Sequence, residues 1–314
     1  MILPELADIQ DAHKRINPFI HRTPVLTSKL LNKHFDCELS FKCENFQKVG
    51  AFKFRGAMNA VRMLSADDKL KGVVTHSSGN HAAALALAAS MNAIKAYIVM
   101  PENAPVVKKN AVAGYGAEIT YCKSTLQGRE EATRMIIDKT GATLIHPYDN
   151  FNVICGQGTS ALELLQEKSD LDIVIAPVGG GGLMSGTSAC VKGMNEAIRV
   201  IGAEPFNAND AFISFTSGKL TPSVNPVTCA DGLLTSLSEL TFSVIRKNVN
   251  EIYTAREESI IECMLLIWER MKIIIEPSSA TVLAVVKENP SIFRGKRIGL
   301  IISGGNVDFR NLPF

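Results

Sequence analysis

The sequence predicts an α/β protein built from two open parallel sheets, each with helices on both faces. Short continuous apolar runs of strand length alternate with longer segments of helical periodicity. Apolar runs of this kind suit strands that are buried on both faces of a parallel sheet. The length of 314 residues favours two domains, since a domain has roughly 150 residues, and 46% hydrophobic residues supply the cores.

The order of the elements predicts how the chain is divided. Strands are expected at 73–75, 96–100, 118–121, 143–145, 173–177, 200–204 and 298–302. Helices are expected at 81–91, 106–113, 130–139, 159–167, 182–194 and 260–272. Because alternating strands and helices form compact α/β units, we predict a small domain at 72–148. It is inserted into a discontinuous large domain of residues 1–68 and 150–314, and a ligand is expected where the two meet.

Charge and cysteine content exclude several classes of protein. The 33 basic and 31 acidic residues leave a net charge of +2, which disfavours nucleic acid or a membrane surface as a partner. The sequence contains no apolar stretch of membrane-spanning length, and its N-terminus lacks the order of a signal peptide. Seven scattered cysteines without a CxxC motif predict free thiols in a reducing compartment, the cytoplasm.

A run of four glycines is the strongest chemical signal. Gly179, Gly180, Gly181 and Gly182 follow a predicted strand and precede a helix that begins near Leu183. Glycines expose backbone N–H groups, and a helix N-terminus attracts anions, so the segment suits a phosphate. It matches neither the dinucleotide fingerprint nor the P-loop. The alternative is a tight turn from strand to helix.

A lysine between two aromatic residues is the second signal. Lys53 lies between Phe52 and Phe54 and near Arg55. Burial and a neighbouring cation both lower the pKa of a lysine, as a Schiff-base nucleophile requires. Taken alone, Lys53 could be a surface lysine at a helix start. A lysine together with a cradle for one phosphate is what pyridoxal phosphate demands.

Two further segments place polar groups at strand ends. Residues 76–81 contain hydroxyls, an amide and the free N–H groups of a helix start, which together suit a carboxylate, although a capped helix is the alternative. The histidines in this segment lack the spacing of metal ligands. Ser303 follows the last strand, where its hydroxyl could bond a ring nitrogen, or could belong to an ordinary turn.

These segments resemble the fold-type II family of pyridoxal-phosphate enzymes, which have the fold of the tryptophan synthase β chain and include serine and threonine dehydratases. Similar stretches extend over nearly the whole chain, and within the family they are most similar to the eukaryotic serine racemase branch. They are HRTP at 21–24, FQK at 46–48, THSSGNH at 75–81, GQGT at 156–159, WERMK at 268–272 and SGGNVD at 303–308.

The resemblance implies a role for each matching residue. Lys53 would bind pyridoxal phosphate covalently and act as the base on one face of the substrate Cα. Phe52 and Asn80 would contact the ring, the glycine run and Leu183 would bind the phosphate, and Ser303 would meet the ring nitrogen. The substrate, a small amino acid, would be held by Ser77, Ser78, Asn80, His81, Arg129 and Tyr148.

Ser78 separates the candidate reactions. Racemisation needs a second acid/base opposite Lys53, and the racemase branch has a serine at this position, whereas many threonine dehydratases have alanine. We therefore expect a serine racemase that also converts serine to pyruvate and ammonia by α,β-elimination. Hydroxyaspartate dehydratases also carry the serine, and Ser78 could simply cap a helix. The alternatives are a dehydratase for threonine or 3-hydroxyaspartate without significant racemisation, and a binding protein on a decayed enzyme scaffold.

The resemblance also implies a metal and a nucleotide. Glu204, Ala208 and Asp210 resemble the metal loop of the racemases and supply oxygen ligands for Mg²⁺, Mn²⁺ or Ca²⁺, although their spacing alone indicates only a solvated loop. ATP would bind as an allosteric activator at the interface of a homodimer. Eight residues match the positions expected for it: Ser28, Lys29, Leu30, Lys48, Val49, Tyr115, Lys272 and Asn306. Lys29 and Val49 depart from the mammalian pattern, which has serine and threonine at these positions.

Overall fold

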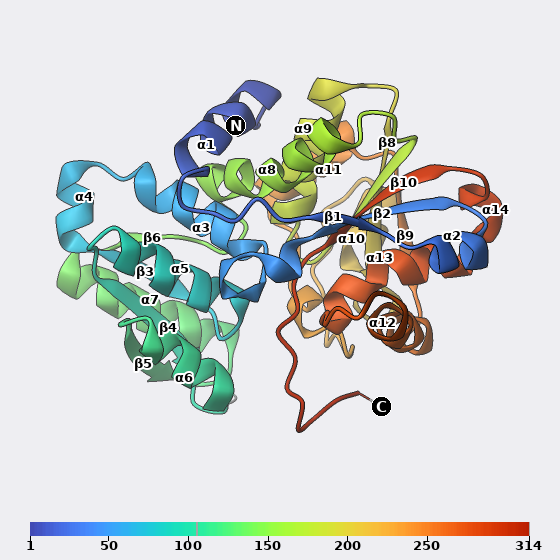
Figure 1. Cartoon of the computed structure of the whole chain (residues 1–314). Helices are drawn as coiled ribbons and strands as arrows, with labels where there is room; N and C mark the ends of the chain where they lie inside the picture. The colour runs from blue at the N-terminus through green and yellow to red at the C-terminus, as the bar shows by residue number, and fades with distance from the viewer. Residues whose placement is uncertain (105, 314) are drawn as a thin grey trace.

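The computed structural model describes residues 1–104 and 106–313 and contains two sheets side by side (Figure 1). The larger sheet has six strands in the order β1-β2-β10-β7-β8-β9. All neighbouring strands are parallel except β1, which is antiparallel to β2. The strands are β1 Val25–Thr27, β2 Glu38–Cys43, β7 Ile173–Pro177, β8 Arg199–Pro205, β9 Glu251–Ala255 and β10 Arg297–Ile302.

The smaller sheet has four parallel strands in the order β5-β4-β3-β6. Its strands are β3 Val73–His76, β4 Ala96–Pro101, β5 Glu118–Cys122 and β6 Thr143–Leu144. The predicted fold class is confirmed: the chain is α/β, with mainly parallel sheets between helices. The domain boundaries at 68, 72, 148 and 150 stay a prediction, and residue 314 of the predicted large domain lies outside the described residues.

Helices cover both faces of each sheet. α13 and α12 pack on one face of the larger sheet, and α8 and α9 pack on the other. α5 and α7 pack against the smaller sheet, where their apolar residues fall in separate clusters. The longer helices are α1 Leu6–Ile16, α3 Lys53–Arg62, α5 Asn80–Met91, α6 Val106–Gly114, α7 Leu126–Thr140, α8 Phe151–Glu167, α9 Gly182–Met194, α10 Asp210–Ser217, α11 Glu239–Asn248, α12 Glu257–Met271 and α13 Pro277–Glu288. Short helices are α2 Lys29–Phe35, α4 Ala66–Lys71, α14 Pro290–Phe293, η1 Glu44–Phe46, η2 Lys48–Gly50, η3 Phe206–Ala208 and η4 Asp231–Leu233.

α3 lies between the two halves of the molecule. It contacts α8 on the side of the larger sheet and α5 on the side of the smaller one, as Figure 1 shows. All of its residues from Phe54 to Val61 are buried. The first residue of α3, Lys53, is therefore held where the two sheets face each other. None of the helices in the described residues is both long enough and apolar enough to cross a bilayer.

Candidate active site

A cavity of about 450 Å³ opens between the two sheets. Its wall includes the residues predicted from the sequence to bind the cofactor and the substrate. These are Phe52, Lys53, Ser77, Ser78, Asn80, His81, Arg129, Tyr148, Gly179, Gly180, Gly181, Gly182, Leu183 and Ser303. They come from segments far apart in the chain, which meet because the carboxyl ends of parallel strands converge at one edge of each sheet.

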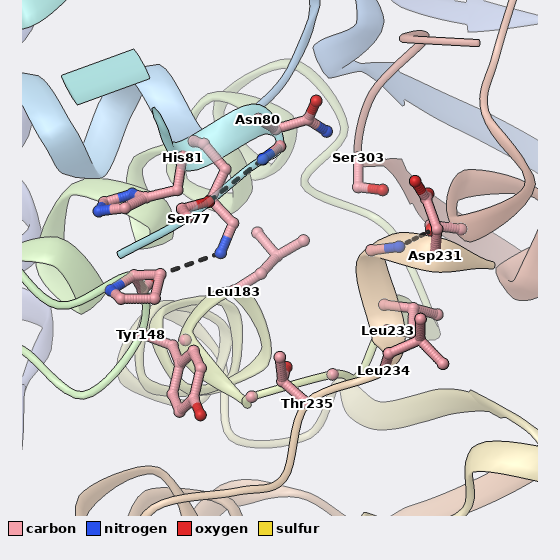
Figure 2. Close-up of a pocket in the computed structure, with 18 of the residues that line it drawn as sticks. Ser77, Asn80, His81, Tyr148, Leu183, Asp231, Leu233, Leu234, Thr235 and Ser303 are labelled. Atoms are coloured by element: carbon pink, nitrogen blue, oxygen red, sulfur yellow. Dashed lines mark hydrogen bonds between the residues drawn. The ribbon is translucent and has the colours of Figure 1, made fainter. Parts of the chain in front are cut away.

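The glycine run forms a turn that side chains could not occupy. β7 ends at Pro177 and α9 begins at Gly182, and Gly181 has a φ of 85°, a conformation that favours glycine. A Cβ on Gly180 would lie 2.3 Å from the ring of Tyr148. Figure 2 shows Tyr148 and Leu183 on this side of the cavity. The first turn of α9 thus presents backbone N–H groups to the cavity, and the run fits a phosphate.

Lys53 has a nucleophilic amine in a partly apolar setting. Its Nζ donates a hydrogen bond to the carbonyl of Pro147 at 3.0 Å and lies 5.0 Å from the centre of the Phe52 ring. Burial lowers the pKa of Lys53 to about 8, although the nearby Glu276 carboxylate opposes the shift. A lysine with this pKa is partly neutral near pH 8, as attack on an aldehyde requires.

Ser303 ends the last strand with a buried hydroxyl. Its Oγ lies 3.0 Å from Oγ of Ser279, which also donates to the Gly304 carbonyl at 2.7 Å. Since Ser279 has only one hydroxyl proton and the carbonyl takes it, the proton of Ser303 is free to point to Ser279 or into the cavity. Ser303 can therefore donate to a neutral ring nitrogen. The sequence reasoning missed Ser279, which lies within the buried face of α13.

Asn80 is tied to a carboxylate that the sequence reasoning also missed. Its Nδ2 bonds both oxygens of Glu276, at 3.0 and 3.2 Å, and its Oδ1 accepts from Nδ2 of Asn306 at 2.9 Å. Burial raises the pKa of Glu276 to about 7. The available signal was one acidic residue that ends the apolar run 273–275, just before Pro277.

The residues predicted to hold a carboxylate lie around the start of α5. Ser77 accepts from the backbone N–H of Gly79 at 3.3 Å, and Ser78 makes no side-chain hydrogen bond within residues 1–104 and 106–313. The ring of His81 bonds the Ile145 carbonyl through Nε2 at 3.0 Å and points away from Ser303 in Figure 2. His81 can thus serve an anion only through its backbone N–H. Arg129 reaches the same cavity from α7, and its buried Nε has no hydrogen-bond partner among the described residues.

The three predicted metal ligands lie at the end of β8. Glu204 accepts from the backbone N–H groups of Ala211 and Phe212, at 2.9 and 2.8 Å, and burial raises its pKa well above the usual value. Among the described residues, neither oxygen of Asp210 has a hydrogen-bond partner of good geometry. Burial raises its pKa to about 6, although the backbone of Leu237 and the Ser223 side chain oppose the shift. Two buried carboxylates near the Ala208 carbonyl fit a hard cation with oxygen ligands. No cluster of three histidine, cysteine or acidic side chains suits a metal in the described part of the chain.

The eight residues predicted for ATP are only partly brought together. Val49, Tyr115 and Asn306 line a second cavity of about 700 Å³, which shares Asn80 and Asn306 with the first. Ser28 caps α2 by accepting from the N–H of Leu31, so it and Lys29 and Leu30 lie at the start of that helix. Lys48 lies above the ring of Phe54, and Lys272 follows α12. These five residues are not part of the second cavity.

The glycine run and Lys53 fit pyridoxal phosphate, and comparisons with known proteins show the family of the chain. The family model of pyridoxal-phosphate dependent enzymes matches residues 16–304, so the chain belongs to this family. A serine racemase from Dictyostelium discoideum is 50% identical over 98% of this chain and 96% of its own. A β-hydroxyaspartate dehydratase from Paracoccus denitrificans is 47% identical over the full length of both. The crystal structure of the Dictyostelium racemase superimposes with a TM-score of 0.93 at 51% identity, covering 97% of this chain and 99% of that chain.

Proposed function

We propose that the protein is a serine racemase that interconverts L-serine and D-serine and also converts serine to pyruvate and ammonia by α,β-elimination. One observation carries the proposal: Lys53 and Ser78 line the same cavity, and no described residue engages the Ser78 hydroxyl. Two proton-transfer groups at one site are what racemisation requires. The 50% identical relative named serine racemase supports the same reaction.

Each residue of the site has its own role in the proposed reaction. Bound pyridoxal phosphate supplies an electron sink that stabilises negative charge at the substrate Cα. Backbone N–H groups at the start of α9 would hold its phosphate, and Ser303 would donate to its ring nitrogen. The helix start at α5, with Ser77 and Asn80, holds the substrate carboxylate. Lys53 and Ser78 would then remove and return the Cα proton on opposite faces. Loss of the β-hydroxyl as water would leave an enamine, whose imine form takes up water and releases ammonia and pyruvate.

An isotope experiment tests this proposal. We expect that L-serine incubated with the holoenzyme in D₂O yields D-serine carrying deuterium at Cα, together with pyruvate. Chiral chromatography with mass detection measures the first product, and a coupled dehydrogenase assay measures the second. Pyruvate without any D-serine would show that the protein is a dehydratase and not a racemase.

A dehydratase for 3-hydroxyaspartate or threonine is the second candidate. The β-hydroxyaspartate dehydratase relative favours the first of these substrates, and so does Arg129, whose buried Nε is unpaired among the described residues. A guanidinium in the cavity can receive the second carboxylate of 3-hydroxyaspartate. If this reading is right, kcat/KM for 3-hydroxyaspartate exceeds that for serine, and Arg129→Lys lowers only the former.

We also propose finer features that the resemblance implies. Glu204, Ala208 and Asp210 bind Mg²⁺, Mn²⁺ or Ca²⁺, ATP activates allosterically, and the enzyme is a cytoplasmic homodimer with a small domain at 72–148. The buried carboxylate of Asp210, which has no hydrogen-bond partner of good geometry among the described residues, supports the metal. The grouping of Val49, Tyr115 and Asn306 at the second cavity supports a ligand there. Sedimentation with and without ATP measures both the oligomer and the effect of the nucleotide.

A further inference from the structure

We propose that His146, as a neutral imidazole protonated on Nε2, is a positioning residue that orders the turn at 146–149 and thereby fixes Lys53 and Tyr148. Nδ1 of His146 accepts the backbone N–H of Asp149 at 2.9 Å and faces that of Tyr148 at 3.5 Å. A ring nitrogen that accepts a hydrogen bond carries no proton, so in a neutral ring the proton lies on Nε2.

The ring of His146 is held between two other aromatic side chains. Its centre lies 5.5 Å from that of His76 and 4.6 Å from that of Tyr148, with near-perpendicular planes in both cases. Perpendicular packing on both sides sets the orientation of the imidazole, and thus the direction in which Nδ1 points. Burial and the neighbouring His76 lower the pKa of His146 to about 4, which keeps Nδ1 available as an acceptor at neutral pH.

The turn places two groups at the cofactor site. Its second residue, Pro147, provides the carbonyl that accepts from Lys53 Nζ at 3.0 Å. Its third residue, Tyr148, has its ring where a Cβ of Gly180 would stand. Both residues lie in the turn that the hydrogen bond to His146 Nδ1 closes. This one acceptor atom therefore orders Pro147, which bonds Lys53, and Tyr148, which packs against the glycine run.

His146 acts through these neighbours rather than on the substrate. It does not line the cavity, whereas Lys53, Pro147 and Tyr148 all do. One N–H of Lys53 donates to the Pro147 carbonyl, and this bond fixes the position of Nζ. The lone pair of the nitrogen is then free to attack the cofactor aldehyde. In that reaction the neutral amine joins the aldehyde carbon and one water leaves. A misplaced amine slows such a step, since displacement by about 1 Å can cost up to a hundredfold.

Two variants of His146 test the acceptor nitrogen and the aromatic ring separately. His146→Asn keeps an acceptor oxygen at the δ position but loses the ring, whereas His146→Phe keeps a ring but loses the acceptor. We expect stopped-flow absorbance to show that the Phe variant's apoenzyme captures pyridoxal phosphate at least roughly tenfold more slowly than native, and the Asn variant within about threefold. His34→Phe, at an exposed site on α2, is the matched control and should be unchanged. Equal rates for the two His146 variants, or a native rate for the Phe variant, would overturn the proposal.

A second measurement reads the native protein directly and needs no substrate. Long-range ¹H–¹⁵N spectra of the ¹⁵N-histidine-labelled native apoenzyme report which ring nitrogen of each histidine is protonated. We expect the signal set that disappears in the Asn variant, and therefore belongs to His146, to show an unprotonated Nδ1 and a protonated Nε2 near pH 7. A protonated Nδ1 would refute the assignment. The proposal rests on Lys53 as the cofactor lysine, but because no amino acid is used, failure of the racemase proposal leaves both readouts standing.

Discussion

The side-chain amide of Asn80 donates to both carboxylate oxygens of Glu276, at 3.0 and 3.2 Å. Asn80 begins α5 beside the smaller sheet, and Glu276 precedes α13 beside the larger one. The bond therefore joins the two halves of the molecule across the cavity. A further donor, the backbone N–H of Asn306, reaches Glu276 at 3.2 Å. These amide donors lower the pKa of Glu276, but burial outweighs them and raises it.

The buried carboxyl of Glu276 makes stability depend on pH. Its pKa is raised from 4.5 to about 7 by burial, so between these values the unfolded chain is ionised while the folded protein keeps its proton. Stability is therefore lost as pH rises through this window, by up to about 3 kcal/mol. We expect Glu276→Gln to gain stability relative to the native protein from pH 4.5 to 7, as measured by urea unfolding of the apoenzyme. Glu258→Gln, at an exposed site on α12, is the control, and a pH-independent difference for Glu276→Gln would contradict the prediction.

Removal of the Ser78 hydroxyl should separate the two proposed reactions. Ser78→Ala leaves Lys53 as the proton-transfer group on one face, so we expect racemisation to fall by at least roughly a hundredfold while elimination from one enantiomer persists. The hydroxyl has no hydrogen-bond partner within the described residues, so the melting temperature should hardly move. Chiral analysis and pyruvate release are measured on one sample. Equal loss of both reactions would argue against two proton-transfer groups.

The close approach of Tyr148 to the glycine run predicts a steric effect on cofactor binding. An alanine at position 180 would place its Cβ 2.3 Å from the Tyr148 ring, which must then move from the cradle. We expect Gly180→Ala to weaken pyridoxal phosphate binding by at least roughly tenfold, about 1.4 kcal/mol, in a fluorescence titration. Gly114→Ala serves as control, because a Cβ there meets nothing within 4 Å. Native affinity in the Gly180 variant would show that the cradle tolerates a side chain.

The buried carboxylate of Asp210 predicts a response to divalent cations. A cation that binds only the folded state raises its stability, so Mg²⁺ should raise the melting temperature by a few degrees and a chelator should reverse the effect. Asp210→Asn should abolish the increment, while Asp67→Asn, at an exposed position on α4, should preserve it. An increment that survives in Asp210→Asn would place the cation elsewhere.

Secondary structure could be predicted where apolar periodicity was uninterrupted. All seven expected strands are present, from β3 to β8 and at β10, with ends shifted by at most a few residues. β2 was missed because its pattern contains Lys42, which a sequence pattern assigns to the surface. In the structure Lys42 is fully buried and pairs with Glu163 at 2.6 Å. A buried charge is tolerated only when it has a partner, and the partner of Lys42 is distant in the chain. The local sequence pattern therefore could not reveal this strand.

The residues of the site also fall into those that local sequence predicts and those that only the packing reveals. The sequence by itself determined the groups that adjoin one another in the chain: the glycine run, Lys53 between aromatic residues, and Ser78 before a helix. Only the tertiary structure decided that Glu276 bonds Asn80 across 196 residues, that Ser279 meets Ser303, and that His146 closes the turn beside Lys53. Neighbouring residues share a local conformation that their own side chains dictate. Contacts between distant segments depend on how the helices and strands pack, and no single stretch of sequence encodes that packing.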